Sequence, residues 1–307
     1  MHASRRGRAD AIENAMTLYE RTGSLSLDRL GPQDLVEVFG FLDQDPVLNV
    51  YLLALALRDG LASARDEFWG VRRDETLVAL LHLGSQSGAA LPVGADPPAL
   101  KLLAEQLVQR RAFLPRRFQV IGPRTAVHEL VGRLERDALP PRIRRDQVYM
   151  KLEPEGLAPF ERLPELRRAA REDYTMVFES GARLRTEELE EDPRIADPAG
   201  YARRTEDECR DGYTHLWSDA QGLRFRASVS AVTPDAAQVS GVYTPPERRN
   251  RGFARRGLSE LCQRLFERSR HVCLFVNDFN ASALAVYRRM GFREIADWAS
   301  AFYPGPG

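Results

Sequence analysis

The feature that most constrains the fold is a strand-like run that stops at two prolines and is followed by an amphipathic helix. Residues 238–244 alternate in polarity and are rich in Val and Tyr, as expected of a strand. Pro245 and Pro246 cannot donate ladder hydrogen bonds, so the strand must end there. Beyond Gly252, apolar residues recur at helical spacing, at Ala254, Leu258, Leu261, Cys262 and Leu265.

The loop between this strand and this helix has features of an anion-binding site. The first N–H groups of a helix have no intrahelical acceptor, and the positive end of the helix dipole lies beside them. Gly252 has no Cβ to keep a phosphate from the backbone, and Arg249, Arg251 and Arg255 add positive charge. A glycine before a helix is also ordinary turn chemistry, and an arginine-rich run is also typical of a solvated surface. The loop alone leaves both interpretations open.

The length of the chain, 307 residues, indicates two globular units of roughly 150 residues each. We expect a polar lead-in over residues 1–23, a first α/β domain over 24–153, a linker over 154–164 and a second domain over 165–307. The linker is predicted from four closely spaced residues that interrupt helices and strands, Pro154, Gly156, Pro159 and Pro164.

Hydrophobic periodicity predicts the elements of both domains. In the first domain we expect helices over 32–42, 46–58, 97–111 and 124–137, and strands over 67–72, 76–83, 117–121 and 147–152. In the second domain we expect strands over 165–169, 213–218, 223–233, 236–244, 271–276 and 293–303, and helices over 170–191, 198–211, 252–268 and 280–290. The fold class is therefore α/β, with a mixed central sheet and helices on its faces.

Composition argues against several classes of protein: nucleic-acid-binding, membrane, secreted and metal-binding. Lys and Arg number 44 and so do Asp and Glu, so a globally basic nucleic-acid-binding protein is not expected. The longest apolar run, residues 47–57, is too short for a membrane span, and the N-terminus has no apolar signal-peptide region. Three scattered cysteines form no metal-binding pattern. We expect a cytoplasmic protein with no metal and no nucleic-acid or membrane partner.

Two short motifs carry a resemblance to a known family. The first is Arg249-x-x-Gly252-x-Ala254, preceded by a strand and a proline. The second is Asn280-x-x-Ala283-x-x-x-Tyr287, followed by Gly-Phe at 291–292. Together they resemble the GNAT superfamily of N-acetyltransferases, over about residues 165–307. The resemblance implies transfer of an acetyl group from acetyl-CoA to a primary amine by direct attack in a ternary complex.

The resemblance also assigns residues by position. Val242, Tyr243 and Thr244 are similar to the strand that pairs with the pantetheine arm. The pyrophosphate loop is implied for Arg249, Asn250, Arg251, Gly252, Phe253, Ala254 and Arg255. Asn280 is similar to an asparagine near the cofactor, and Tyr287 to the general acid that protonates the departing thiolate. On residues alone, Asn280 is also a helix N-cap and Tyr287 also a core aromatic.

The general base is the part that the motifs do not supply. Some relatives have a glutamate five residues before the asparagine, and this sequence has Phe275 there. Glu187, Glu188 and His215 are the other candidates, although each is also compatible with a structural role.

The first half has neither motif. The whole chain nevertheless resembles tandem GNAT proteins, in which a degenerate N-terminal half with a DPVxN-like segment, here residues 45–49, precedes an active C-terminal half. An unrelated α/β domain is the alternative. The expected acceptor is a small molecule or a peptide, and the expected state is a monomer or a homodimer.

Two other functions are weighed against an enzyme. A non-catalytic acyl-CoA-binding protein is suggested by the missing carboxylate at Phe275. A nucleic-acid-binding protein rests only on the run RRNRGFARR at residues 248–256, with one aromatic residue among its arginines.

Overall fold

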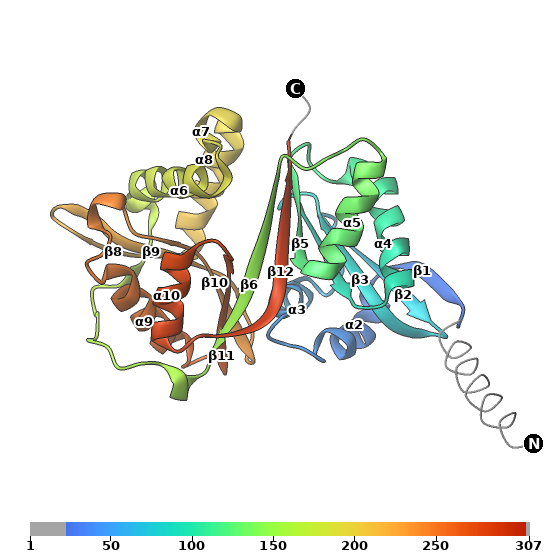
Figure 1. Cartoon of the computed structure of the whole chain (residues 1–307), viewed down its shortest axis with the longest axis horizontal. Coiled ribbons are helices and arrows are strands. Elements are labelled where there is room, and N and C mark those ends of the chain that lie inside the picture. The colour runs from blue at the N-terminus through green and yellow to red at the C-terminus, as the bar shows by residue number, and fades with distance from the viewer. Residues whose placement is uncertain (1–22, 305–307) are drawn as a thin grey trace, which may run out of the picture. The chain divides into compact units, whose positions relative to one another are not determined.

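A computed structural model describes residues 23–304 of the chain (Figure 1). The predicted lead-in over 1–23 lies outside the described residues except for Gly23. By their internal contacts, the described residues form two compact units. The first comprises residues up to Phe41, Leu61–Pro141 and the chain from Phe302 onwards, and the second comprises Leu42–Gly60 and Arg142–Ala301.

The first unit is built on a five-stranded mixed sheet with the strand order β1-β2-β3-β4-β5. Neighbouring strands are antiparallel except for β4 and β5, which pair in parallel. The strands are β1 (Leu25–Leu30), β2 (Asp66–Arg73), β3 (Thr76–Gly84), β4 (Ala89–Gly94) and β5 (Phe118–Pro123). The helices of this part of the chain are α2 (Leu35–Leu42), α4 (Pro97–Gln109) and α5 (Arg124–Arg136), with short 3-10 turns η1 (Pro32–Asp34) and η2 (Arg111–Phe113).

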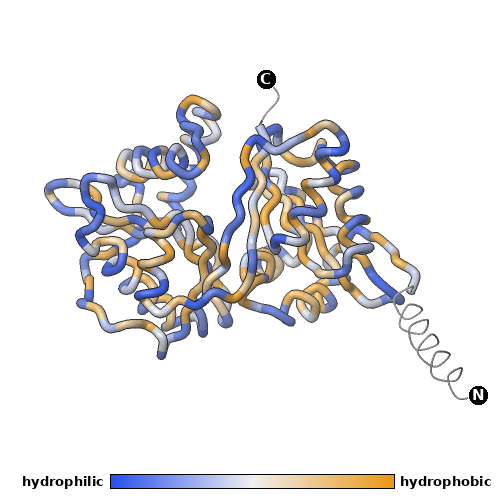
Figure 2. Tube along the Cα trace, viewed as in Figure 1, coloured by the Kyte–Doolittle hydropathy of each residue, from blue (hydrophilic) through white to orange (hydrophobic). Residues whose placement is uncertain are grey.

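The core of the first unit lies between this sheet and the helices α4 and α5. Both helices bury the apolar face that the periodicity predicts, with Leu100, Leu103 and Leu107 on α4 and Leu130 and Leu134 on α5 almost fully buried. The Asp96 side chain caps α4 by accepting a hydrogen bond from the N–H of Ala99 at 3.1 Å. Hydrophobic residues are concentrated along the strands of this unit (Figure 2).

The second unit has a seven-stranded mixed sheet with the order β12-β6-β11-β10-β9-β8-β7. Its strands are β6 (Ile143–Leu152), β7 (Arg167–Arg168), β8 (Thr214–Asp219), β9 (Gly222–Val232), β10 (Ala236–Tyr243), β11 (His271–Asn277) and β12 (Arg293–Tyr303, whose last two residues are grouped with the first unit). Its helices are α3 (Val50–Asp59), α6 (Tyr174–Leu189), α7 (Pro193–Ala196), α8 (Pro198–Asp211), α9 (Phe253–Leu265) and α10 (Ala281–Met290), with 3-10 turns η3 (Pro154–Gly156), η4 (Arg171–Asp173) and η5 (Pro246–Arg248).

Alternation along β9 places helices on both faces of this sheet. Phe225, Ala227 and Val229 share one hydrophobic cluster with the buried faces of α9 and α10. The intervening Arg226 and Ser228 point to the opposite face, where they contact α6 and α8. This confirms the expected class of mixed sheet with helices on its faces.

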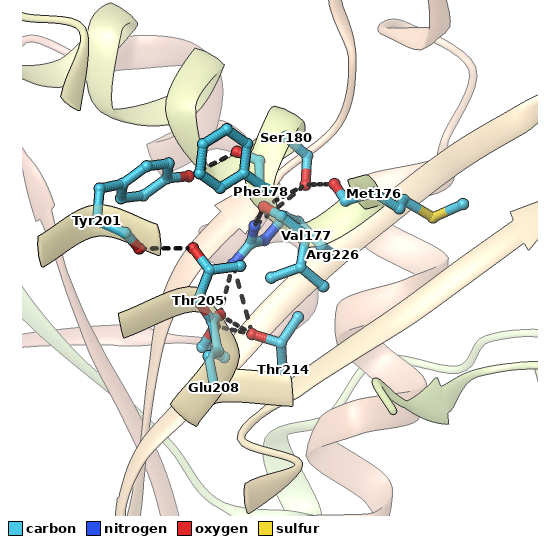
Figure 3. A network of polar contacts seen from close by, with 10 residues as sticks. Met176, Val177, Phe178, Ser180, Tyr201, Thr205, Glu208, Thr214 and Arg226 are labelled. Carbon is cyan, nitrogen blue, oxygen red and sulfur yellow. Dashed lines mark hydrogen bonds and ion pairs between the residues drawn. The ribbon is translucent and has the colours of Figure 1, made fainter. Parts of the chain in front are cut away.

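Arg226 is the centre of the polar contacts that attach α6 and α8 to the sheet (Figure 3). The residue is 3% exposed, and its guanidinium donates to the Val177 carbonyl at 2.8 Å, the Ser180 hydroxyl at 3.1 Å and the Glu208 carboxylate at 2.7 Å. Breaking a buried ion pair of this kind typically costs about 3–5 kcal/mol. Arg226 therefore fixes the position of both helices over β9.

The two units are not divided as the sequence predicts. The segment 42–60, with α3, and the strand β6 lie in the second unit although both precede the predicted linker. β6 is the antiparallel neighbour of β11, from Gln147 opposite Asn277 to Leu152 opposite Val272. A strand from the first half of the sequence thus completes the sheet that holds both motifs.

A buried polar cluster holds segment 42–60 against this sheet. The hydroxyl of Tyr149 on β6 donates to the Val47 carbonyl at 3.0 Å, lies 3.2 Å from the Cys273 thiol on β11, and accepts from the Gln238 amide on β10 at 3.0 Å. Within the segment, the Asn49 amide donates to the Leu42 carbonyl at 2.8 Å. The DPVxN-like residues therefore form the turn that leads into α3.

Other sequence predictions differ from the structure in detail. β1 and β4 are strands that the sequence analysis did not predict. In β4, Pro92 and Gly94 resemble loop residues, but β4 pairs with β5 only through its first residues, Ala89 and Ala90, so Pro92 needs no partner on that side.

The predicted linker is packed: Leu163 is buried, and its N–H donates to the Glu260 carboxylate on α9 at 3.0 Å. Within residues 23–304, no helix is both long and apolar enough to cross a membrane.

Candidate active site

The two central parallel strands of the second unit separate after a short ladder. β10 and β11 pair from Ala236 opposite His271 to Gln238 opposite Cys273. Beyond this point β10 bulges twice against β9, between Gln238 and Val239 and between Ser240 and Tyr243. The edge of β10 that faces β11 is therefore free of ladder pairing from Val239 onwards. An extended ligand with amide groups can bind such an edge as an added strand.

The last residues of β10 and the residue after it leave polar groups for such a ligand. Val242 packs against the hydrophobic core, and Tyr243 and Thr244 are buried. Within the described chain, neither the Tyr243 hydroxyl nor the Thr244 hydroxyl has a hydrogen-bond partner. Because buried polar groups in native proteins are nearly always satisfied, these two hydroxyls are available to a water or to a ligand.

The loop after β10 turns sharply through two left-handed residues. Asn250 has φ +60° and Gly252 has φ +79°, and α9 begins directly after Gly252. No side chain caps α9, and a Cβ on Gly252 would meet no atom within 4 Å. The first N–H groups of α9 are therefore available to an anion, and open space lies in front of them.

Arginines of the loop divide into two groups. Arg249 is bound to the protein: it donates to the Thr244 carbonyl at 3.0 Å and pairs with Glu187 at 2.6 Å. Arg251 and Arg255 have no ion pair among residues 23–304. Arg251 lies 5.1 Å from the Phe253 ring, and Arg255 contacts the Pro159 carbonyl at 3.4 Å. These two guanidinium groups can therefore meet a phosphate.

Phe253 and Ala254 begin α9 and fix its position. The Phe253 ring packs edge-on against Trp217 of β8, with ring centroids 5.1 Å apart. Ala254 is half-buried beside it. Phe253 therefore has a packing role that holds the start of the helix, and the binding groups here are backbone N–H groups.

The second motif forms α10 and both of its ends. The Asn280 side chain accepts a hydrogen bond from the Ala283 N–H at 3.1 Å, so Asn280 is the N-cap, and Gly291 ends the helix at φ +106°. Tyr287 is 7% exposed, and its ring centroid is 5.8 Å from that of Phe292. Burial raises the pKa of Tyr287 above its usual value, and the Glu188 carboxyl and the Cys262 thiol raise it further. The hydroxyl therefore stays protonated at neutral pH.

The three sequence candidates for a general base lie in different surroundings. Glu187 is occupied by Arg249. His215 lies on β8, two strands from β10. Glu188 lies near the end of α6, and its charge acts on Tyr287. Desolvation raises the pKa of Glu188 to about 6, partly offset by Arg185 and reinforced by Glu187. By accessible surface, however, the Glu188 side chain is exposed.

Phe275 has no catalytic group to offer. On β11 its ring centroid lies 6.2 Å from that of Tyr149 and 6.3 Å from that of Trp298. The position is part of an aromatic cluster. The residues described hold no group of three His, Cys, Asp or Glu side chains arranged for a metal ion.

Sequence reasoning missed one residue that contacts the end of α6 next to Glu188. Arg145 on β6 donates to the Glu188 carbonyl at 3.2 Å, pairs with Glu190 at 2.9 Å and lies 5.4 Å from the ring of Phe279. No pattern in the sequence could have found it, because β6 precedes the linker and reaches the site only through its pairing with β11.

The separating parallel strands, the left-handed loop and the two helices are the fold of the GNAT acetyltransferases, and solved structures share this fold. A GCN5-related N-acetyltransferase from Sphaerobacter thermophilus aligns with a TM-score of 0.56 at 16% identity, covering 92% of this chain and 96% of that one. A tandem GNAT protein from the clavulanic acid biosynthesis pathway aligns at 0.52 and 16%, covering 92% and 99%. A GNAT-family acetyltransferase from Colwellia psychrerythraea aligns at 0.54 and 10%, covering 91% and 99%.

Each match to a family model covers only part of the chain. Residues 223–302, which contain both motifs, match the model of the FR47-like protein family. Residues 66–177 match a domain of unknown function, DUF4081. No curated protein matches the chain significantly. The resemblance of the C-terminal half to the GNAT superfamily, and of the whole chain to tandem GNAT proteins, is therefore confirmed at the level of fold.

Proposed function

We propose that the protein is an N-acetyltransferase that transfers an acetyl group from acetyl-CoA to a primary amine by direct attack in a ternary complex. The observation that carries this proposal is the separation of β10 from β11 after Gln238, next to an uncapped helix start and the buried Tyr287. An elongated thioester with an anionic end matches this order of features: an open strand edge, then a loop of N–H donors.

Acetyl-CoA would be held mainly by backbone groups. Residues 242–244 would pair with the amides of the pantetheine arm, and the N–H groups from Asn250 to Arg255 would bind the pyrophosphate. The open space at the Cβ position of Gly252 fits a phosphate close to the backbone. Arg251 and Arg255, which have no ion pair among the described residues, would contribute charge.

The chemistry needs one proton acceptor and one proton donor. The amine must be neutral to attack, and Glu188, with its pKa raised to about 6, takes its proton near neutral pH. The amine nitrogen then forms a bond to the thioester carbonyl carbon, and the C–S bond breaks. The nitrogen carries an extra proton after the attack and releases it to solvent as the amide forms. The departing thiolate takes the proton of the Tyr287 hydroxyl; solvent then reprotonates Tyr287 and takes up the proton held by Glu188. The products are the N-acetylated amine and CoA.

The acceptor is proposed as a small molecule or a peptide that carries a primary amine, and the protein as a cytoplasmic monomer or homodimer. Nothing in this site requires a metal, since the nucleophile is an amine and the leaving thiolate is protonated by Tyr287.

Amine-dependent release of free thiol from acetyl-CoA tests this proposal. We expect release with at least one member of a panel of small amines and peptides, and a strong reduction in Tyr287→Phe. Tyr174→Phe, which removes a hydroxyl from the opposite end of α6 to Glu188, is the matched control and should keep full activity. Tight binding of acetyl-CoA with no thiol release by any amine would instead favour the non-catalytic acyl-CoA-binding function.

A further inference from the structure

A second cavity lies in the same unit, outside the residues assigned above to acetyl-CoA. Its volume is about 830 Å³, within the range of small-molecule sites. It is lined by α3, the end of α8, β8, β9 and the last turn of α9. The segment from β10 through the loop to the start of α9 contributes Ser240 alone, and α10 contributes nothing. The proposed acetyl transfer leaves this cavity unexplained.

A buried histidine with one unpaired ring nitrogen faces this cavity. His215 is 9% exposed, and its Nδ1 has no hydrogen-bond partner in the part of the chain that the structure describes. In the sheet, His215 lies directly opposite Arg168 of β7, so the two side chains leave the same face as neighbours. The Arg168 stem runs past Gly212, where a Cβ would lie 3.4 Å from its Cδ.

Charges around the cavity are mostly neutralised by local partners. Seven charged side chains line it, and four already have ion-pair partners: Glu208 with Arg226 at 2.7 Å (Figure 3), Asp211 with Arg210 at 2.8 Å, Arg58 with Asp59 at 2.7 Å, and Arg264 with Glu260 at 2.9 Å. Among residues 23–304, the other three, Arg168, Arg268 and Glu267, have no ion pair.

The surroundings of His215 are therefore positive. Desolvation, together with the charges of Arg168 and Arg264, lowers the pKa of His215 to about 4, and a hydrogen bond to the Tyr213 backbone opposes this shift. The imidazole is neutral at physiological pH, its Nδ1 is unpaired among the described residues, and Arg168 is its cross-strand neighbour. A bound anion would neutralise this excess positive charge and would favour a proton on the imidazole.

We infer that this cavity binds a small anionic molecule through a carboxylate or phosphate group held by Arg168 and His215. Arg168 supplies a planar pair of donors and the imidazole supplies one more, a set that suits either anion. Leu265 of α9 and Val229 of β9, which keep some exposed surface, offer apolar contact to the rest of the molecule. This inference does not depend on the proposed acetyl transfer.

Titration of the His215 imidazole by NMR tests the inference. The probes are inorganic phosphate and acetate, titrated separately, and the signal is assigned by its loss in His215→Asn. We expect a saturable shift with at least one probe and a rise in the pKa of His215 when that probe is bound. Binding of phosphate alone would indicate a phosphate site, and binding of acetate alone a carboxylate site.

Variants of Arg168 distinguish a specific anion site from nonspecific ion binding. Arg168→Gln is expected to weaken the probe's affinity about tenfold, and Arg168→Lys to restore part of it. Arg270→Gln removes an arginine whose side chain is 79% exposed and does not line the cavity, and should change nothing. No saturable shift with either probe, or equal affinity in Arg168→Gln and wild type, would overturn the inference. Circular dichroism, measured separately, shows that each variant is folded.

Discussion

Replacing Glu260 by Gln is expected to loosen the segment that joins the two halves of the sequence. Glu260 lies on α9 with its side chain 1% exposed, and its carboxylate accepts hydrogen bonds from Arg162 at 2.8 Å, from the Leu163 N–H at 3.0 Å and from Arg264 at 2.9 Å. Gln retains one carbonyl acceptor but loses the charge. Both the segment around Leu163 and the helix α9 lose an anchor.

The size of the effect follows from the pKa of Glu260. The hydrogen bond from Arg162 lowers this pKa most; burial opposes it, and the Leu163 N–H and Arg264 lower it further, bringing it from 4.5 to about 2. This corresponds to at most ~3 kcal/mol. Because the Arg162 side chain is 64% exposed, solvent screening reduces the expected loss to ~2 kcal/mol at neutral pH.

The direction of this pKa shift determines how the stabilisation by Glu260 varies with pH. A carboxyl group with a lowered folded-state pKa stabilises the fold above its unfolded-state pKa, and this contribution disappears as pH falls from about 4.5 towards about 2. The gap between wild type and Glu260→Gln in the free energy of unfolding should therefore be full at neutral pH and nearly closed near pH 2. Urea denaturation, together with hydrogen exchange at the Leu163 amide, measures it.

Glu267→Gln is the matched control, since Glu267 has no ion pair among the residues described and is expected to show almost no change. Equal midpoints for the two variants at neutral pH would refute the reasoning. So would a deficit in Glu260→Gln that stays constant down to about pH 2.

Three further predictions concern a helix end, a helix surface and the proposed base. Gly291→Ala should cost more than ~3 kcal/mol, because φ is +106° and the new Cβ would lie 1.9 Å from the Gly156 carbonyl oxygen; an unchanged thermal midpoint would contradict this. Gly132→Ala in α5, where a Cβ meets nothing within 4 Å, should raise stability by ~0.5–1 kcal/mol in the same assay. With an identified amine, kcat/KM should rise with pH through about 6 as Glu188 loses its proton. Glu188→Gln should abolish that limb, and an identical pH profile would exclude Glu188 as the base.

Local sequence patterns predicted the elements around the motifs because those elements are set by local chemistry. Pro245 and Pro246 end β10, Asn280 caps α10, and Gly291 ends it in the left-handed region. The amphipathic stripe of α9 likewise fixes which face it buries. These are interactions between residues a few positions apart, so a single sequence carries them.

Nonlocal packing was beyond the sequence. β6 joins β11 over more than a hundred residues of chain, and segment 42–60 is held by Tyr149 through a single hydroxyl. Neither contact produces a hydrophobic periodicity that could be detected in the sequence. The same holds for the site. The motifs indicated Gly252 and Tyr287, but the difference between the two neighbouring glutamates was not predictable. Only the structure shows that Glu187 pairs with Arg249 and that the pKa of Glu188 on α6 is raised.

The most direct test of the central claim is isothermal titration of acetyl-CoA into wild type, Gly252→Asp and Gly60→Asp. Both glycines have positive φ, and a Cβ on either meets nothing within 4 Å, so the two substitutions carry similar strain. Only the change at Gly252 puts bulk and negative charge where the pyrophosphate is proposed to bind. We predict saturable binding to wild type and Gly60→Asp and loss of binding in folded Gly252→Asp. Equal affinity in all three proteins, or no binding to wild type, would contradict the assignment of residues 242–255 as the acetyl-CoA site.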